Sequence, residues 1–180
     1  MSDVLPDLLA PGLALVICGS AAGRRSAELR QYYAGRGNKF WRTLHQIGLT
    51  PRQLAPSEFR LLLDFGIGLT DVVKNQSGPD ARIDFARASP EALRAKIASC
   101  SPRWLCFSSK RAAKTCLGRN VTYGLQPETI GTTRLFVAPS PSGAASGFWD
   151  VAVWHALARR VKARGRASES AVRHRHRTVA

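Results

Sequence analysis

Three short polar segments in this 180-residue chain lie within apolar runs or at their ends. They are Gly19-Ser20-Ala21-Ala22-Gly23 after the run 13–18, Thr70-Asp71 within the run 66–73, and residues 140–146 after the run that begins at 133. Continuous apolar runs are typical of strands that are buried on both faces of a parallel sheet. Because ligands bind at the carboxyl ends of such strands, we expect the three segments to line one cleft.

Aromatic and cationic side chains follow the first of these segments. Arg24 and Arg25 come directly after Gly23, and Tyr32 and Tyr33 lie a few residues further on. The whole chain is basic, with a net charge of +15 and a pI of about 11.0. A basic surface binds polyanions by releasing their counterions, so nucleic acid is the expected partner.

The positive charge is not confined to the C-terminus. The segment 159–180 has eight Lys or Arg residues and one acid, and the remaining residues are basic as well. We expect one domain over 1–164 and a basic, disordered tail over 165–180 that strengthens nucleic-acid binding without sequence preference. No apolar run is long enough to cross a bilayer, and the N-terminus lacks the basic start of a signal peptide, so a cytoplasmic location is expected.

The alternation of apolar and amphipathic segments predicts the fold class. Strands are expected over 13–18, 66–73 and 103–109 and from 133 onward, and helices over 26–33, 38–47, 57–65, 90–99, 110–117 and from 151 to about 161. Strands that alternate with helices form a parallel sheet covered on both faces. The sequence therefore predicts an α/β fold of three αβα layers around a mostly parallel, four-stranded sheet.

Residue spacing argues against metal and nucleotide cofactors. The four cysteines, Cys18, Cys100, Cys106 and Cys116, include no C-x-x-C pair and show no ligand spacing with the four histidines. The glycines of 19–23 do not form G-x-G-x-x-G, and no G-K-[ST] motif is present. We expect no metal and no cofactor.

Five segments resemble the uracil-DNA glycosylase superfamily in the family's order, most closely its mismatch-specific uracil/thymine branch, with features of the hypoxanthine-excising branch. They are Gly-x-x-x-Gly at 19–23, YYAGRGNKFW at 32–41, GIGLTDVV at 66–73, GLQPETI at 124–130 and PSPSGAAS at 139–146. Five collinear matches are specific where one alone is weak. The resemblance implies a glycosylase fold and hydrolysis of the bond between a flipped base and deoxyribose.

The resemblance also assigns roles to residues of the cleft. Tyr33 stands where the mismatch-specific branch has an aromatic that stacks on the base, although packing of Tyr32 and Tyr33 onto the core is the alternative. The base-binding residues implied are Gly19, Ser20, Ala21, Tyr33 and Asn38. The DNA-binding residues implied are Arg24, Arg25, Lys110, Ser140, Ser142, Gly143 and Ala144.

The chain departs from the family at Ala21, where the mismatch-specific branch has an asparagine that positions the attacking water. An alanine side chain cannot hold water. Asp71 is our first choice as a replacement, because a carboxylate accepts a proton from water and stabilises a cationic sugar. Asn38 is the second, since its amide can orient water or bind a base edge. The simpler alternatives are an ion pair for Asp71 and a helix cap for Asn38.

The segment 140–146 also departs from the family. Ser140 replaces a His or Asn, and Ala144 and Ala145 stand where relatives have a bulky residue that fills the hole left by the flipped nucleotide. The serines can contact phosphate, and backbone N–H groups can face the departing base anion. Without a bulky plug, we expect uracil to be processed in single strands as well as in duplexes.

The sequence therefore predicts a monomeric, monofunctional DNA glycosylase that removes uracil, and other deaminated bases, and leaves an abasic site in base-excision repair. Its partner would be single- and double-stranded DNA at the nucleoid. The alternative is a catalytically silent protein that binds uracil-containing or abasic DNA, which the substitution of asparagine by Ala21 motivates.

Overall fold

The computed structural model describes residues 2–175, with side chains described up to residue 163. A five-stranded sheet has the order β2-β1-β3-β5-β4. The strands are β1 (Leu15–Ala22), β2 (Ile67–Ser77), β3 (Trp104–Phe107), β4 (Gly124–Ile130) and β5 (Thr133–Val137). β2, β1, β3 and β5 are parallel, and β4 runs antiparallel to β5.

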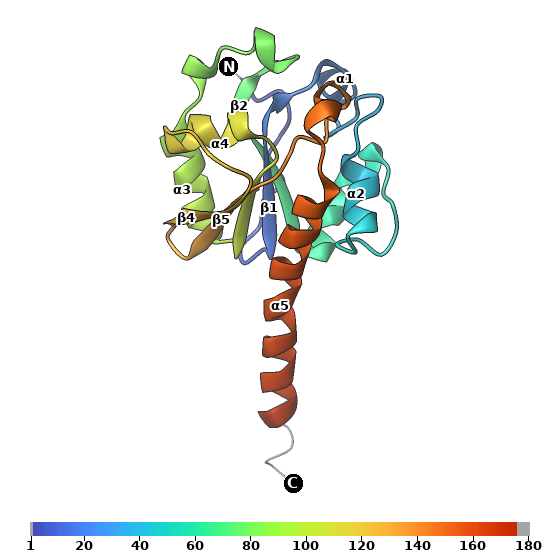
Figure 1. Cartoon of the computed structure of the whole chain (residues 1–180), viewed down its shortest axis with the longest axis vertical. Coiled ribbons are helices and arrows are strands. Elements are labelled where there is room, and N and C mark those ends of the chain that lie inside the picture. Colours follow the sequence, from blue (N-terminus) through green and yellow to red (C-terminus); the bar gives the residue numbers. More distant parts are fainter. Residues whose placement is uncertain (1, 176–180) are drawn as a thin grey trace.

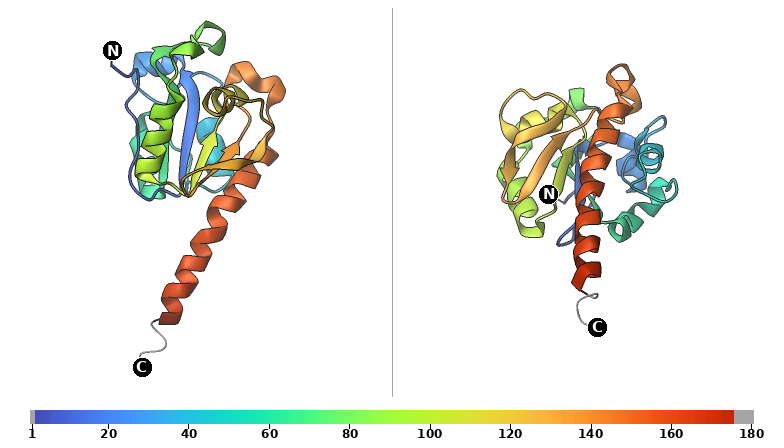
Figure 2. Two further views of the ribbon diagram at one scale, coloured as in Figure 1. Left: turned by 90° about the vertical axis from the view of Figure 1, so that its left-hand side faces the viewer. Right: turned by 60° about the horizontal axis from the view of Figure 1, so that its bottom comes forward.

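The helices follow the predicted alternation. The α-helices are α1 (Arg24–Leu29), α2 (Phe40–Gln46), α3 (Pro90–Cys100), α4 (Lys110–Leu117) and α5 (Val151–Arg175). Short 3-10 helices are η1 (Pro56–Phe65), η2 (Asp80–Arg82), η3 (Phe85–Arg87) and η4 (Gly143–Phe148). Figures 1 and 2 show α3 and α4 on one side of the sheet and α2 and α5 on the other, which confirms the three-layer α/β class.

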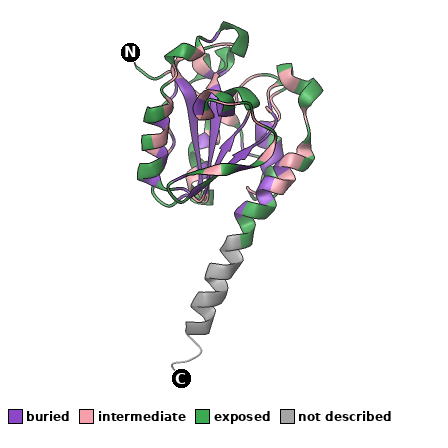
Figure 3. Ribbon diagram, turned by 60° about the vertical axis from the view of Figure 1, so that its left-hand side comes forward, coloured by how far each residue is buried: buried purple, intermediate pink, exposed green. Residues whose placement is uncertain are grey.

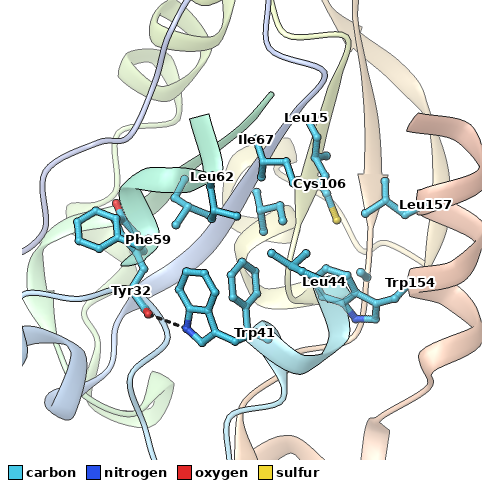
Figure 4. Close-up of a cluster of buried hydrophobic side chains, with 14 of the residues drawn as sticks. Leu15, Tyr32, Trp41, Leu44, Phe59, Leu62, Ile67, Cys106, Trp154 and Leu157 are labelled. Carbon is cyan, nitrogen blue, oxygen red and sulfur yellow. Dashed lines mark hydrogen bonds between the residues drawn. The ribbon is translucent and has the colours of Figure 1, made fainter. Parts of the chain in front are cut away.

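Side chains of the central strands alternate between two apolar cores. On β1, Leu15 and Ile17 pack with the aromatic side chains of α2, η1 and α5, whereas Val16 and Cys18 pack with α3 and α4. The strands are accordingly buried, and the outer surfaces of the helices are exposed (Figure 3). Figure 4 shows the first core, in which Trp41 Nε1 donates a hydrogen bond to the Tyr32 carbonyl oxygen at 3.2 Å. This core anchors the segment that carries the tyrosines.

The expectation of four strands was one too few. The additional strand, β4, is the GLQPETI segment, for which the sequence predicts no strand. It contains Pro127, its side chains are mixed in burial, and its pairing with β5 is interrupted between Leu125 and Thr129. An interrupted edge strand with proline lacks the apolar run by which a buried strand is recognised.

Two predicted helices are shorter than expected. The helix predicted over 26–33 ends at Leu29, and Arg30 and Tyr33 both adopt a positive φ of 53°. The helix predicted from residue 38 begins at Phe40, whose N–H bonds Asn38 Oδ1 at 2.9 Å. The segment between α1 and α2 is therefore an irregular loop that places Tyr33 and Asn38 outside regular helix.

The first two strands are longer than predicted. β1 continues through Ala22, so the segment 19–22 is strand rather than loop, and β2 continues to Ser77, so Asp71 lies inside the strand rather than at its end. β1 lies between β2 and β3. The connection from β1 to β2 carries α2 on one side of the sheet, and the connection from β2 to β3 carries α3 on the other. Such a point of divergence opens a crevice at the carboxyl ends of the strands.

The C-terminal helix completes the fold. α5 extends to Arg175, past the domain end predicted at 164. Side chains from residue 164 onward and residues 176–180 lie outside the described part, so disorder of the tail 165–180 stays a prediction. Among the described residues, no helix is long and apolar enough to cross a membrane.

Candidate active site

A cavity of about 680 Å³ opens at the carboxyl ends of β1 and β3. Eleven of the thirteen residues predicted for the site line it: Gly19, Ser20, Ala21, Arg24, Tyr33, Asn38, Asp71, Lys110, Ser140, Ser142 and Ala144. Arg25 and Gly143 are not among the lining residues, and the exposed Arg25 side chain instead pairs with Glu28 at 3.2 Å. The cleft expected from the strand order is thus a single cavity.

Asp71 reaches this cavity from inside β2. Its Cα is in register with Gly19 of β1, and a Cβ atom on Gly19 would collide with Asp71 Oδ1. The same Cβ would lie 3.4 Å from the Tyr33 hydroxyl oxygen. Gly19 therefore provides the space in which Asp71 and Tyr33 approach each other over the end of β1.

The Asp71 carboxyl group is buried and has no hydrogen-bond partner among the described side chains and backbone. It is 6% exposed, and burial raises its pKa to about 7, an effect opposed by the charge of Lys74 and increased by that of Asp7. The ion pair proposed as the simple alternative for Asp71 is absent from the described residues. A carboxyl group that titrates near neutral pH inside a cavity is suited to general-base and electrostatic catalysis.

The neighbouring lysine is bound elsewhere. Lys74 Nζ lies 2.7 Å from Asp7 Oδ1 and donates a further hydrogen bond to the Leu5 carbonyl oxygen at 2.7 Å. Lys96 and Thr70 bind the same Asp7 carboxylate. Asp7 therefore neutralises the lysine charge nearest to Asp71 and leaves the Asp71 carboxyl group without a paired cation.

Tyr33 forms an aromatic wall beside Asp71. Its ring stacks on Phe40 with centroids 3.8 Å apart and an interplanar angle of 16°, and its hydroxyl lies 3.2 Å from Ser108 Oγ. Burial and the Asp71 charge raise the pKa of Tyr33, which keeps the hydroxyl protonated. Tyr32, by contrast, is 2% exposed and donates to the Pro6 carbonyl oxygen. Both tyrosines line the cavity and pack against the first core, but Tyr33 is the less buried of the two.

Asn38 lies on the cavity wall just before α2. Its Oδ1 accepts the first N–H group of α2, that of Phe40, although the N-cap residue of the helix is Lys39. The side chain is nevertheless half-buried and lines the cavity. Capping uses the amide oxygen only, and it leaves the NH₂ group for other partners.

Ala21 lines the cavity, and its side chain can hold no water. The neighbouring Ser20 connects this wall to residues that sequence reasoning missed. Ser20 Oγ donates to Asp80 Oδ2 at 3.2 Å and lies 2.9 Å from Ser109 Oγ. These contacts join the start of η2 and the N-cap of α4 to β1, and all three residues line the cavity.

The segment 140–146 forms the rim, and its backbone differs from the expectation. The Ser142 and Ala144 N–H groups bond Ser140 Oγ and Ser142 Oγ, both at 3.3 Å, so they are not free for a base anion. Ala144 and Ala145 line the cavity without filling it. Phe148, three residues later, also lines it and is 75% exposed, which makes it a bulky rim side chain that the motif did not reveal.

Cationic side chains surround the opening. Arg24, Lys110 and Arg111 line the cavity, and Lys110 Nζ lies 4.4 Å from the Tyr123 ring centroid. These charges are suited to phosphate contacts, which position nucleic acid without reading its sequence.

The described residues contain no cluster of three or more His, Cys, Asp or Glu side chains placed to hold a metal ion.

Comparison with known proteins identifies the family. A sequence model of the Uracil DNA glycosylase superfamily matches residues 6–158, which includes every residue that lines the cavity except Leu5. The chain belongs to this superfamily. A similar solved structure is the solution NMR structure of a candidate uracil DNA glycosylase from Methanosarcina acetivorans, with 25% sequence identity and a TM-score of 0.59. The match covers 88% of this chain and 96% of that chain. Membership supports DNA glycosylase chemistry and a DNA substrate in general terms.

Proposed function

We propose that the protein is a monofunctional DNA glycosylase that hydrolyses the N-glycosidic bond of uracil, and of other deaminated bases, in base-excision repair. The observation that carries this proposal is the buried, unpaired Asp71 carboxyl group in a cavity lined by Tyr33 and Asn38. The candidate uracil DNA glycosylase from Methanosarcina acetivorans supports uracil as the first substrate to test.

The substrate nucleotide would leave the base stack before reaction. A glycosylase gains access to its bond by turning the nucleotide into a pocket, where an aromatic side chain replaces the lost stacking. The half-buried Tyr33 ring, held from behind by Phe40, offers such a surface. Arg24, Lys110 and Arg111 would hold the flanking phosphates at the opening.

The reaction breaks the bond between C1′ of deoxyribose and the ring nitrogen of the base. The bonding electron pair leaves with the base, and positive charge develops on the sugar. The ionised Asp71 stabilises that charge and accepts a proton from the water that attacks C1′. The departing base takes up a proton, and the products are free base and an abasic site with a C1′ hydroxyl group.

This scheme accounts for Ala21, because the carboxyl group of Asp71 supplies the function that the asparagine has in relatives. It disfavours the silent DNA binder. A protein that only binds DNA gains nothing from a buried carboxyl group without partners, since burial of such a group costs stability.

The decisive experiment measures base release. The purified chain is incubated with oligonucleotides that contain one uracil, thymine or hypoxanthine, each as a single strand and as a duplex, and abasic sites are then cleaved with alkali. We expect cleavage at uracil only after alkali, and no cleavage of a matched cytosine oligonucleotide. Tight binding of uracil DNA without any base release would support the silent binder instead.

A further inference from the structure

A second, smaller cavity adjoins the active-site cavity at the edge of the sheet. We call it the β4 groove; its volume is about 310 Å³, and it is lined by residues 123–125 and by Phe136, Ala152, Val153, Ala156 and Arg160. It therefore lies between the start of β4 and the N-terminal part of α5. Tyr123, directly before β4, lines both cavities. The β4 groove thus shares a wall with the active site.

The surface of the groove is mostly apolar. Leu125 of β4 is 42% exposed, and Phe136, which pairs with it from β5, is fully buried. Gln126 is buried, and its Nε2 donates to the carbonyl oxygens of Thr122 and Gly124. The GLQPETI segment therefore presents Leu125 to the groove as an apolar side chain that nothing in the described chain covers.

The charges around the groove are positive. Arg160 lines it, with its guanidinium carbon 5.8 Å from the Phe136 ring centroid, and no Asp or Glu is among the lining residues. Lys110 lines the active-site cavity on the other side of Tyr123. Within the described part of the chain, neither cation forms an ion pair. Both charges are therefore available to an anionic ligand.

Apolar side chains beside unpaired cations are suited to a single nucleic-acid strand. Bases stack on apolar and aromatic side chains, while cations hold the phosphates between them. A second copy of this chain fits the groove less well, because its net charge of +15 would bring like charge to a basic surface. A DNA strand whose nucleotide occupies the neighbouring cavity brings the next bases to the groove by covalent connection.

We propose that the β4 groove is a subsite for the base of a nucleotide that neighbours the excised one on the same DNA strand. That base contacts Leu125 and Tyr123, and Arg160 binds a phosphate beside it. The inference rests on the proposed glycosylase function and specifies its substrate, because a neighbouring base enters the groove only when it is unpaired. The preferred substrate is then single-stranded or locally open DNA.

The test removes one neighbouring base at a time. Single-stranded oligonucleotides carry one uracil on a 2′-fluoro sugar that resists cleavage. At each nearby position on either side of the uracil, the nucleotide is replaced in turn by tetrahydrofuran, which keeps the phosphate and lacks the base. We expect the loss of the base at one position to weaken binding about 5- to 100-fold, the scale of stacking of one base, and at the others less than about twofold.

Leu125→Gln is the informative variant, because it keeps the length of the side chain and removes the apolar surface. It should weaken binding of the intact oligonucleotide and show no further loss at the sensitive position. Leu61→Gln is the matched control, since Leu61 is 38% exposed on η1 and lines neither cavity. It should keep the full effect of the missing base.

Arg160→Gln tests the phosphate contact separately. It should keep the sensitive position, because Leu125 remains, and it should reduce the slope of log affinity against log salt by about one. Unfolding midpoints near that of the unaltered protein show that the variants are folded.

Three results would overturn the inference. They are an unaltered protein without a single sensitive position, a Leu125→Gln protein that keeps the full effect of the missing base, and a dimer in sedimentation that Leu125→Gln dissociates. The last would assign the groove to a second copy. Because binding is measured on uncleavable DNA, a protein with a sensitive position but no base release would keep this inference and lose the proposed activity. Base release with a flat scan would do the reverse.

Discussion

Two aspartates near β2 have opposite surroundings. Asp7 has a cation or hydroxyl on each oxygen, with Lys74 Nζ at 2.7 Å, Lys96 Nζ at 2.6 Å and Thr70 Oγ1 at 2.7 Å. Burial alone would raise the pKa of Asp7, but these partners outweigh burial and lower it. Asp71 is more deeply buried and lacks such partners, and its pKa rises to about 7.

The difference shows that the fold pairs the carboxylate of Asp7, which has a structural role, and leaves the carboxylate of Asp71 unpaired for chemistry. Asp7 fastens the N-terminal segment to β2 and α3, and in doing so it neutralises Lys74. Asp71 is consequently left in the cavity with its charge uncompensated. An unpaired carboxylate stabilises the positive charge that develops in a transition state. A carboxylate that is already paired with a cation does so to a smaller extent.

The largest expected effect is on catalysis by Asp71. Asp71→Asn keeps the size of the side chain but removes its charge and basicity, so we predict a loss of roughly 2–4 kcal/mol of transition-state stabilisation. That loss corresponds to a rate about 30- to 1,000-fold lower. It is measured as single-turnover excision of uracil at saturating protein, and binding of uracil DNA should change little.

Asp7→Asn and Asn38→Ala serve as matched comparisons under the same conditions. Asp7→Asn should lower the rate less than Asp71→Asn does, because it leaves the Asp71 carboxyl group in the cavity and acts on it only through the charge of Lys74. A near-normal rate for Asp71→Asn together with a collapsed rate for Asn38→Ala would contradict the account, because it would make Asn38 the catalytic residue.

The same two aspartates should have opposite effects on stability. The raised pKa of Asp71 means that the folded chain binds the proton more tightly than the unfolded chain, so stability falls as the pH rises from about 4 to about 7. Asp71→Asn should therefore increase the free energy of unfolding above pH 7, by roughly 1–3 kcal/mol. Asp7→Asn should decrease it by roughly 2 kcal/mol, because it leaves partly buried lysines unpaired.

Denaturant unfolding at about pH 8 and at about pH 5 tests the predicted gain in the free energy of unfolding for Asp71→Asn and the predicted loss for Asp7→Asn. The gain from Asp71→Asn should shrink at the lower pH, where the native carboxyl group is protonated. The pKa of Asp7 is lowered, so its contribution should persist at pH 5 and disappear only as the pH falls through the folded pKa, below 3.8. A destabilised Asp71→Asn protein at pH 8 would show that Asp71 has a structural partner after all.

A smaller effect is expected at Tyr33. Tyr33→Ala should weaken binding of uracil DNA by roughly 1–3 kcal/mol, the scale of base stacking on an aromatic ring. Tyr33→Phe keeps the ring on Phe40 and loses only the contact with Ser108, so most of the affinity should remain. Abasic DNA, which has no base to stack, is the control ligand. Equal damage from both substitutions would instead assign the role to the hydroxyl.

Much of the fold could be predicted from the sequence because its central strands are apolar on both faces. Leu15 to Cys18 and Trp104 to Phe107 are buried throughout, and such runs are visible without a structure. The extension of β1 through Ser20 and Ala21 was not visible, since small and polar residues there continue the pairing with β2. β4 was missed for a related reason, because Pro127 and its mixed burial resemble a loop.

The site was predicted as a group of residues but not as a geometry. The order of motifs placed Asp71, Tyr33 and Asn38 at one edge of the sheet, and the cavity confirms that they share it. The contacts of Ser20 with Asp80 and Ser109 span 60 and 89 residues, and no local pattern specifies them. The release of Asp71 from Lys74 likewise depends on Asp7, which is distant in sequence and whose position follows from tertiary packing.

The pH dependence of excision tests the central claim most directly. If ionised Asp71 carries the reaction, the single-turnover rate of the unaltered protein should rise about tenfold per pH unit below its pKa of about 7 and level off above it. The rate is measured at saturating protein from about pH 5 to about pH 9. The Asp71→Asn protein should be slow and should lack that rising limb. A flat profile for the unaltered protein, or the same rising limb in Asp71→Asn, would contradict the assignment of Asp71 as the catalytic carboxylate.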